Sequence, residues 1–207
     1  MPRRTKEDAE ITRNRLLDAA EVVFNAKGVA RTSLAEIAQA ADLTRGAVYW
    51  HFKNKADLFH AMLERVEMPI DAMVEKLGAE QNATPLQFIQ TAAVGVLKHI
   101  AVDEKSQRVF EIVNHKCELV DDMVIARERQ LESRAGCLAH MQESIQAAID
   151  QNALPKTLNA HSAAIGLHSL IDGLISNWVM SPESFSLGDE AEFLISTYLI
   201  GFKGKSV

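Results

Sequence analysis

Apolar residues recur every three to four positions along most of this chain, the spacing that places side chains on one face of an α-helix. In the first such stretch, over Lys6–Ala26, the predicted buried stripe consists of Leu16, Leu17, Ala20, Val23 and Phe24. Gly28 follows as a C-terminal stop. The β-branched runs and Asn-Gly turns that mark strands are missing. The pattern therefore predicts an all-α protein.

The same periodicity continues to the end of the chain without an internal repeat, a low-complexity tract or a flexible linker. After the short helices described next, it predicts helices over 55–78, 85–101, 104–115, 120–151, 160–179 and 189–202. The breaks fall at Leu154-Pro155 and before Pro182, where proline cannot continue a helix. Because Asn54 caps a helix directly, the first small bundle is expected to pass into the larger one through that helix.

Two short helices joined by a tight turn are predicted between residues 32 and 55. Thr32 or Ser33 caps the first of them, and Glu36 stands three residues after Ser33 in capping-box spacing. Thr44 caps the second, over Arg45–Trp50. Asp42 occupies the turn, where a left-handed backbone is often required. The predicted inward-facing residues of this motif are Leu34, Ile37, Ala38, Ala41, Val48 and Phe52.

The outward face of the second short helix is suited to DNA. A helix-turn-helix lays its second helix in the major groove, where Arg45 is placed to pair with guanine. Gly46 is small enough for close approach, and Tyr49, His51 and Lys55 are placed to hold phosphates. A short helix pair is equally expected in any helical bundle. The cluster of aromatic and basic side chains over 49–55 favours the DNA interpretation.

Charge and composition narrow the class of protein. The net charge is −6, yet residues 1–55 carry ten Lys/Arg against seven Asp/Glu, whereas residues 56–207 carry twelve against twenty-one. The basic excess thus lies with the helix-turn-helix, as a DNA footprint requires. No apolar run reaches the ~20 residues of a membrane span. The two cysteines have no metal-ligand spacing and build no disulfide framework, so a reducing cytoplasm and no metal or cofactor are expected.

The segment ARTSLAEIAQAADLTRGAVYWHFKNKADLF resembles the DNA-binding region of the tetracycline-repressor (TetR) family across roughly residues 10–60. The resemblance implies an all-α homodimer, with a three-helix DNA-binding domain over 1–54 and a six-helix ligand-binding and dimerisation domain over 55–207. The family usually has glycine where this chain has Asp42. Residue chemistry and resemblance together give these DNA-binding candidates: Thr32, Ser33, Thr44, Arg45, Gly46, Tyr49, Trp50, His51 and Lys55.

Three later segments, EIVNHKCEL, LIDGLISNW and PESFSLG, are similar to multidrug-efflux repressors of the AcrR and TtgR type. That similarity implies a repressor of a resistance-nodulation-division pump operon, released from double-stranded operator DNA by hydrophobic or cationic drugs. The predicted ligand-binding residues are Glu67, Val96, Phe110, Val113, Asn114, Gln130, Cys137, Met141, His168, Ile171 and Asp172. A buried carboxylate among them would favour a cationic effector. Residue type alone favours an ordinary core position over a ligand wall for Phe110 and Ile171.

Apolar residues near the C-terminus predict a four-helix dimer interface, because one protomer has no need to bury them all: Ala164, Leu167, Ile171, Leu174, Ile175, Trp178, Leu194, Tyr198 and Phe202. A packed hairpin within a monomer is the alternative. Two rival functions remain open at this stage. One is a repressor of a metabolic pathway. The other is a helical enzyme using Asp172 with His115 or His168, for which the sequence offers no nucleophile–base set.

Overall fold

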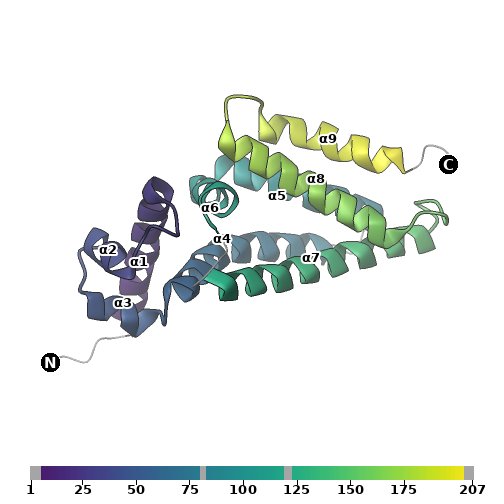
Figure 1. Cartoon of the computed structure of the whole chain (residues 1–207). Coiled ribbons are helices and arrows are strands. Elements are labelled where there is room, and N and C mark those ends of the chain that lie inside the picture. The colour runs from purple at the N-terminus through teal and green to yellow at the C-terminus, as the bar shows by residue number, and fades with distance from the viewer. Residues whose placement is uncertain (1–5, 80–82, 119–122, 203–207) are drawn as a thin grey trace. The chain divides into compact units, whose positions relative to one another are not determined.

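The computed structural model describes residues 6–79, 83–118 and 123–202. Those residues form nine α-helices and no strand (Figure 1). In chain order they are α1 (Lys6–Lys27), α2 (Leu34–Ala40), α3 (Arg45–His51), α4 (Lys55–Gly78), α5 (Pro85–Val102), α6 (Glu104–His115), α7 (Val124–Asp150), α8 (Ala160–Met180) and α9 (Leu187–Gly201). The prediction of an all-α fold is confirmed.

The helices begin and end where the sequence carries capping signals. Gly28 has a φ of +81° and donates its N–H to the Phe24 carbonyl at 2.8 Å, which closes α1. Thr84 and Gln87 form a reciprocal capping box ahead of Pro85, the first residue of α5. Proline costs nothing there, since the first helical N–H has no partner within the helix.

Most of the helix bounds lie within one residue of the sequence prediction. α9 begins at Leu187 rather than Asp189, because the Ser186 side chain accepts from the Asp189 N–H and caps the helix two residues earlier. The predicted start of the long helix at Val120 lies outside the described residues, and within them α7 begins at Val124. Pro69 lies inside α4, where it leaves the carbonyl four residues earlier without its usual N–H donor.

Packing divides the chain into two units, Met1–Val66 with Arg108–Gln130, and Glu67–Gln107 with Leu131–Val207. The first unit has one apolar core, shared by α1 to α3, the first half of α4, and short parts of α6 and α7. Its centre includes Phe24 and Phe59, whose rings meet edge to face at 6.3 Å, and Ile112 of α6. The sequence analysis placed a domain boundary after residue 54, with each domain continuous along the chain. That boundary stays a prediction.

Buried charge ties α1 to α4 and α6 within the first unit. The Glu21 carboxylate is buried, with a side chain only 3% exposed, and pairs with Arg65. Arg108 Nε lies 3.6 Å from the same carboxylate, and Arg65 also reaches Asp18 at 2.8 Å. A buried carboxylate of this kind is costly unless it is paired. These ion pairs therefore fix which side of α1 faces the other two helices.

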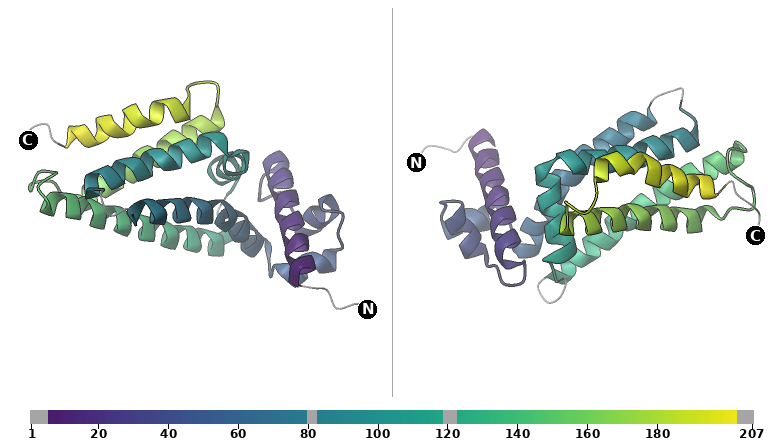
Figure 2. Two further views of the ribbon diagram at one scale, coloured as in Figure 1. Left: turned by 180° about the vertical axis from the view of Figure 1, so that it is seen from behind. Right: turned by 90° about the horizontal axis from the view of Figure 1, so that it is seen from above.

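In the second unit, α9 packs along α5, and α8 contacts both (Figures 1 and 2). At the crossing of α8 and α9 the Tyr198 hydroxyl donates to the Ala163 carbonyl at 3.0 Å. A Cβ at Gly166 would lie 2.1 Å from that hydroxyl oxygen. Glycine at this position is therefore what allows the tyrosine ring to lie against α8.

The residues from which a dimer interface was predicted are mostly used inside the protomer, which corrects that argument. Ala164, Leu167 and Ile171 are buried, as are Ile175 and Trp178. The remaining members, Leu174, Leu194, Tyr198 and Phe202, are partly buried. The sequence misassigned them because helical spacing does not tell an intramolecular α8–α9 contact from an intermolecular one.

Candidate nucleic-acid interface

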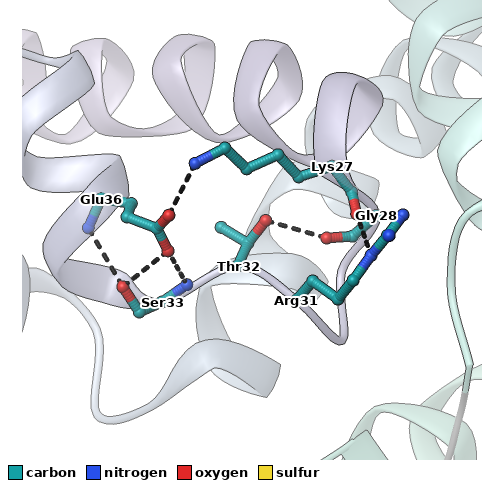
Figure 3. A network of polar contacts seen from close by, with 6 residues as sticks. All are labelled: Lys27, Gly28, Arg31, Thr32, Ser33 and Glu36. Carbon is teal, nitrogen blue, oxygen red and sulfur yellow. Dashed lines mark hydrogen bonds and ion pairs between the residues drawn. The ribbon is translucent and has the colours of Figure 1, made fainter.

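The start of α2 is fixed by a short polar network (Figure 3). The Ser33 hydroxyl accepts from the Glu36 N–H at 3.3 Å, and the Glu36 carboxylate accepts from the Ser33 N–H at 2.8 Å. Lys27 Nζ lies 2.7 Å from the same carboxylate. Lys27, followed by the Ser33 donors, lowers the pKa of Glu36 to about 2. The capping box predicted at Ser33 is confirmed, and the negative charge of Glu36 is balanced locally.

The turn between α2 and α3 has the geometry of a helix-turn-helix. Asp42 adopts a φ of +53°, as predicted for this position. The Leu43 N–H donates to the Ala38 carbonyl at 2.9 Å, and Arg15 Nη2 donates to the Ala41 carbonyl at 2.7 Å. The role of Arg15 was missed, because nothing in the sequence pairs two residues so far apart in the chain. These bonds set the angle at which α3 leaves α2.

Two buried side chains anchor α3 from beneath. Val48 is fully buried and Phe52 is 2% exposed. The guanidinium of Arg13 lies over the Phe52 ring at 5.5 Å. The Thr44 hydroxyl accepts from the Ala47 N–H at 3.3 Å and caps the helix, as predicted. With one face held in the core, the opposite face of this two-turn helix is left to solvent.

That outer face presents basic, aromatic and small residues together. Arg45, Gly46 and Tyr49 are exposed, and Trp50 is 68% exposed although it is the largest apolar side chain. The Arg45 guanidinium lies 5.6 Å from the centre of the Tyr49 ring. A Cβ at Gly46 would meet only the Thr44 hydroxyl, at 3.9 Å. The protein itself therefore has no steric need for glycine at this position.

The other DNA-binding candidates differ in accessibility. Ser33 and Thr44 are exposed, while His51 and Lys55 are partly buried, and Lys55 Nζ donates to the Ala30 carbonyl at 3.3 Å. Thr32 is a correction, since it is only 3% exposed and its hydroxyl donates to the Gly28 carbonyl at 2.8 Å. We therefore assign the Thr32 side chain to the loop before α2 rather than to DNA contact.

The structure adds three exposed residues that the sequence prediction left out of the site, Arg31, Gln39 and Lys53. Gln39 lines a surface hollow of about 480 Å³ together with Thr44 and Arg45. Its place at the end of α2 beside the start of α3 carries no signal in sequence spacing. Arg31 stands before α2 and Lys53 follows α3, and each adds an exposed positive charge.

The predicted ligand-binding residues fall in different parts of the packing. Phe110, Val113, Asn114 and Gln130 belong to the first unit, and the other seven belong to the second. Two of the seven pair within α8, where His168 Nδ1 lies 3.0 Å from Asp172 Oδ2. The Asp172 carboxylate is the main cause that raises the pKa of His168 to about 9. That all eleven of these residues line one ligand pocket stays a prediction.

Comparison with known proteins agrees with a helix-turn-helix regulator of transcription. Residues 16–62 match the model for bacterial regulatory proteins of the tetR family, and residues 84–203 match that for the C-terminal region of MAATS-type transcriptional repressors. The chain therefore belongs to the TetR family of transcriptional regulators.

Individual relatives are similar over nearly the whole chain. TtgR, an HTH-type transcriptional regulator of Pseudomonas putida, is 37% identical over 199 residues, covering 96% of this chain and 95% of TtgR. NalD, the secondary repressor of the MexAB-OprM multidrug efflux pump in Pseudomonas aeruginosa, superposes with a TM-score of 0.86 at 34% identity, covering 95% and 98% of the two chains. SmeT in complex with triclosan gives 0.81 at 30% identity, covering 92% and 91%.

Neither a membrane span nor a metal centre is found among the described residues. None of the helices described is both long and apolar enough to cross a bilayer. No group of three His, Cys, Asp or Glu side chains in the described ranges is arranged to hold a metal ion.

Proposed function

We propose that this chain is a drug-released repressor that binds a palindromic operator as a homodimer and controls a resistance-nodulation-division multidrug efflux operon in the cytoplasm. The observation that carries the proposal is the outer face of α3, where Arg45, Tyr49 and Trp50 are exposed while Val48 and Phe52 hold the helix from beneath. Relatives of this chain include the repressor of an efflux pump, which favours the same kind of target.

The DNA-binding roles follow from the chemistry of the exposed face. Arg45 is the candidate for reading guanine, since its two terminal nitrogens match the two acceptors on that base. Ser33, Thr44, Tyr49 and Lys53 are suited to phosphate oxygens, which set the register of a protein on DNA. Gly46 has no side chain that would hold α3 away from DNA, so the helix can approach the base edges beside Arg45.

Dimerisation is supported by apolar residues that no part of the described protomer covers. Phe193 and Ile200 are 66% and 65% exposed on α9, and Ile165 is 40% exposed on α8. Residues seven apart lie on one face of a helix, so the two α9 residues form one patch. A large exposed apolar patch is costly in water and is typical of an interface. Pairing of this patch with its copy would bring two α3 helices to one palindrome.

A hydrophobic or cationic effector is supported by the second unit. The residues of that unit, 67–107 and 131–207, carry seven Lys/Arg against fourteen Asp/Glu, a charge of −7. In α4, burial is the main cause that raises the pKa of Asp71, with Glu75 adding to it. SmeT, which shares 30% of its sequence with this chain, binds triclosan. To release DNA, the effector must bind more tightly to the state that does not fit the operator, with a coupling of typically ~1–3 kcal/mol.

The test measures binding of the purified protein to fluorescently labelled DNA from upstream of its own gene and of the neighbouring pump operon. We expect Arg45→Ala to weaken binding by ~5- to 150-fold, the equivalent of ~1–3 kcal/mol for a base contact. Arg127→Ala removes the same charge from the exposed surface of α7 and serves as the matched control. Its affinity should stay close to that of the wild type.

Release is tested in the same assay with triclosan and with tetraphenylphosphonium, a hydrophobic cation that does not intercalate into DNA. Either compound should lower the affinity of the wild-type protein for DNA. Equal loss of affinity in Arg45→Ala and Arg127→Ala would contradict the proposed reading face. Full DNA affinity in the presence of both compounds would contradict release by this class of effector.

A further inference from the structure

The surface hollow of about 480 Å³ lies where α2 turns into α3. Three alanines and a leucine contribute its apolar lining, Ala35, Ala38, Leu43 and Ala47. Each alanine carries only a methyl group, and this leaves the space open beside Arg45, which lines it as well. The hollow is therefore continuous with the face that we propose to meet DNA.

Gln39 is the uncharged polar residue that α2 contributes to this hollow. Its side chain is exposed and has no hydrogen-bond partner among the residues that the structure describes. Its backbone is held in place, because the Gln39 carbonyl accepts from the Asp42 N–H at 3.0 Å. A side-chain amide in this state keeps both its donor and its acceptor for a ligand.

The chemistry of the hollow favours the edge of a base pair over a phosphate. Asp42 adds an exposed carboxylate to the lining, which repels a phosphate but accepts from an exocyclic base amine. In the major groove, adenine and cytosine present such an amine, and thymine presents a methyl group that suits contact with alanine. An amine and a methyl group occur together in an A·T pair.

We propose that Gln39 is a specificity-determining residue and that the hollow takes one A·T pair next to the guanine read by Arg45. The Gln39 amide accepts from adenine N6 and donates to adenine N7, and the thymine methyl group packs against the alanines. This inference rests on the proposed function, since α3 must lie in the major groove. It gives a base-reading role to α2, the helix that otherwise braces α3.

The experiment selects binding sequences from randomised double-stranded DNA with the purified full chain, in parallel for the wild type and its variants. The wild type should select a palindrome with an A·T pair next to a G·C pair in each half-site. Gln39→Ala should lose the preference at the A·T position alone, by ~5- to 150-fold. Gln39→Glu should move that preference toward cytosine, whose amine donates to a carboxylate. Both variants keep the fold, because the Gln39 side chain is exposed.

Two control variants separate base reading from general DNA affinity. Lys53→Ala removes an exposed charge suited to a phosphate, so it should weaken binding about equally for every sequence and reduce its salt dependence. Gln151→Ala removes an exposed glutamine from the second unit and should change neither affinity nor preference. In the selected DNA, deoxyuridine in place of the thymine deletes only the methyl group and should lower the affinity of the wild type.

The outcomes distinguish this reader from the repressor function. An unchanged base preference in Gln39→Ala, or a uniform loss of affinity like that of Lys53→Ala, would overturn the role of Gln39 and leave the repressor function standing. Full affinity for the deoxyuridine DNA would refute the seating of an A·T pair in the hollow. Selection of no sequence by the wild type would overturn both proposals. A preference that depends on Gln39, in a protein that neither triclosan nor tetraphenylphosphonium releases, would support the reader and contradict drug release.

Discussion

Replacing Gly166 by alanine tests how α8 and α9 pack against each other. The new Cβ would lie 2.1 Å from the Tyr198 hydroxyl oxygen and 3.1 Å from the ring carbon that bears it. The ring must move, and its hydrogen bond to the Ala163 carbonyl is then lost. Overpacking of this kind costs ~1–3 kcal/mol, and the lost hydrogen bond adds ~1 kcal/mol. Alanine returns ~0.5–1 kcal/mol through helix propensity.

The net expectation is a loss of ~1–3 kcal/mol in the free energy of unfolding. It is measured by urea denaturation at one fixed protein concentration, since the stability of a dimer depends on concentration. Gly173 of the same helix has nothing within 4 Å of an added Cβ, and neither has Gly136 of α7. Alanine at either position should stabilise the protein by ~0.5–1 kcal/mol.

Tyr198→Phe is the second single variant of a double-mutant cycle with Gly166→Ala. Alone it loses the hydrogen bond and should cost ~1 kcal/mol. Combined with Gly166→Ala it removes the atom nearest to the new Cβ, so the double variant should lose less stability than the sum of the two single variants. A Gly166→Ala protein as stable as Gly173→Ala would refute this account of the helix crossing, and so would strict additivity.

Three further predictions concern other parts of the chain. Glu21→Ala leaves Arg65 without its buried partner and should cost ~3–5 kcal/mol in urea denaturation, whereas a loss below ~1 kcal/mol would show that the pair is not buried in solution. Gly46→Ala should leave thermal stability intact or raised, because the site is open, yet weaken operator binding; unchanged DNA affinity would contradict close approach of α3 to the bases. The raised pKa of His168 gives stability that is fully present below its ordinary pKa of 6.5 and is lost as the pH rises through about 9. The stability difference between wild type and His168→Gln should therefore shrink over that pH range, and a difference that grows with pH would reverse the assignment.

Much of the fold was predictable because the signals for it are local. Helical spacing and the caps at Ser33 and Thr44 each depend on residues within one or two turns. The left-handed residue at Asp42 is equally local, because the turn chemistry of aspartate is a property of that residue. Where a cap was overlooked, at Ser186, the helix start moved by two residues.

The features that sequence missed depend on contacts between distant segments. The buried Glu21–Arg65 pair and the bond from Arg15 to the end of α2 join residues far apart in the chain. In the sequence, a buried glutamate cannot be told from an ordinary surface glutamate until its partner is known. The burial of Thr32 was missed for a different reason, because a threonine before a helix is compatible with a helix cap, a phosphate contact or the local bond to Gly28 that it makes.

The dimer residues show the limit of periodicity most clearly. Apolar spacing on α8 and α9 identifies faces that avoid water, but it does not say whether a face packs within the protomer or stays exposed. The burial of each side chain in the structure separates residues of these two kinds. Ile175 and Trp178 face inward, while Phe193 and Ile200 remain exposed. Sequence therefore identified apolar faces on α8 and α9 but did not tell the residues buried within the protomer from those left exposed.

Footprinting of the chain on DNA upstream of its own gene tests the central claim most directly, when wild type and Arg45→Ala are compared with and without tetraphenylphosphonium. Our account predicts protection of one palindrome by the wild-type protein, loss of that protection in the variant, and its loss from the wild type when the cation is added. Protection by the wild type that the Arg45 substitution and the cation both leave intact would contradict it, as would failure to protect any palindrome at moderate salt.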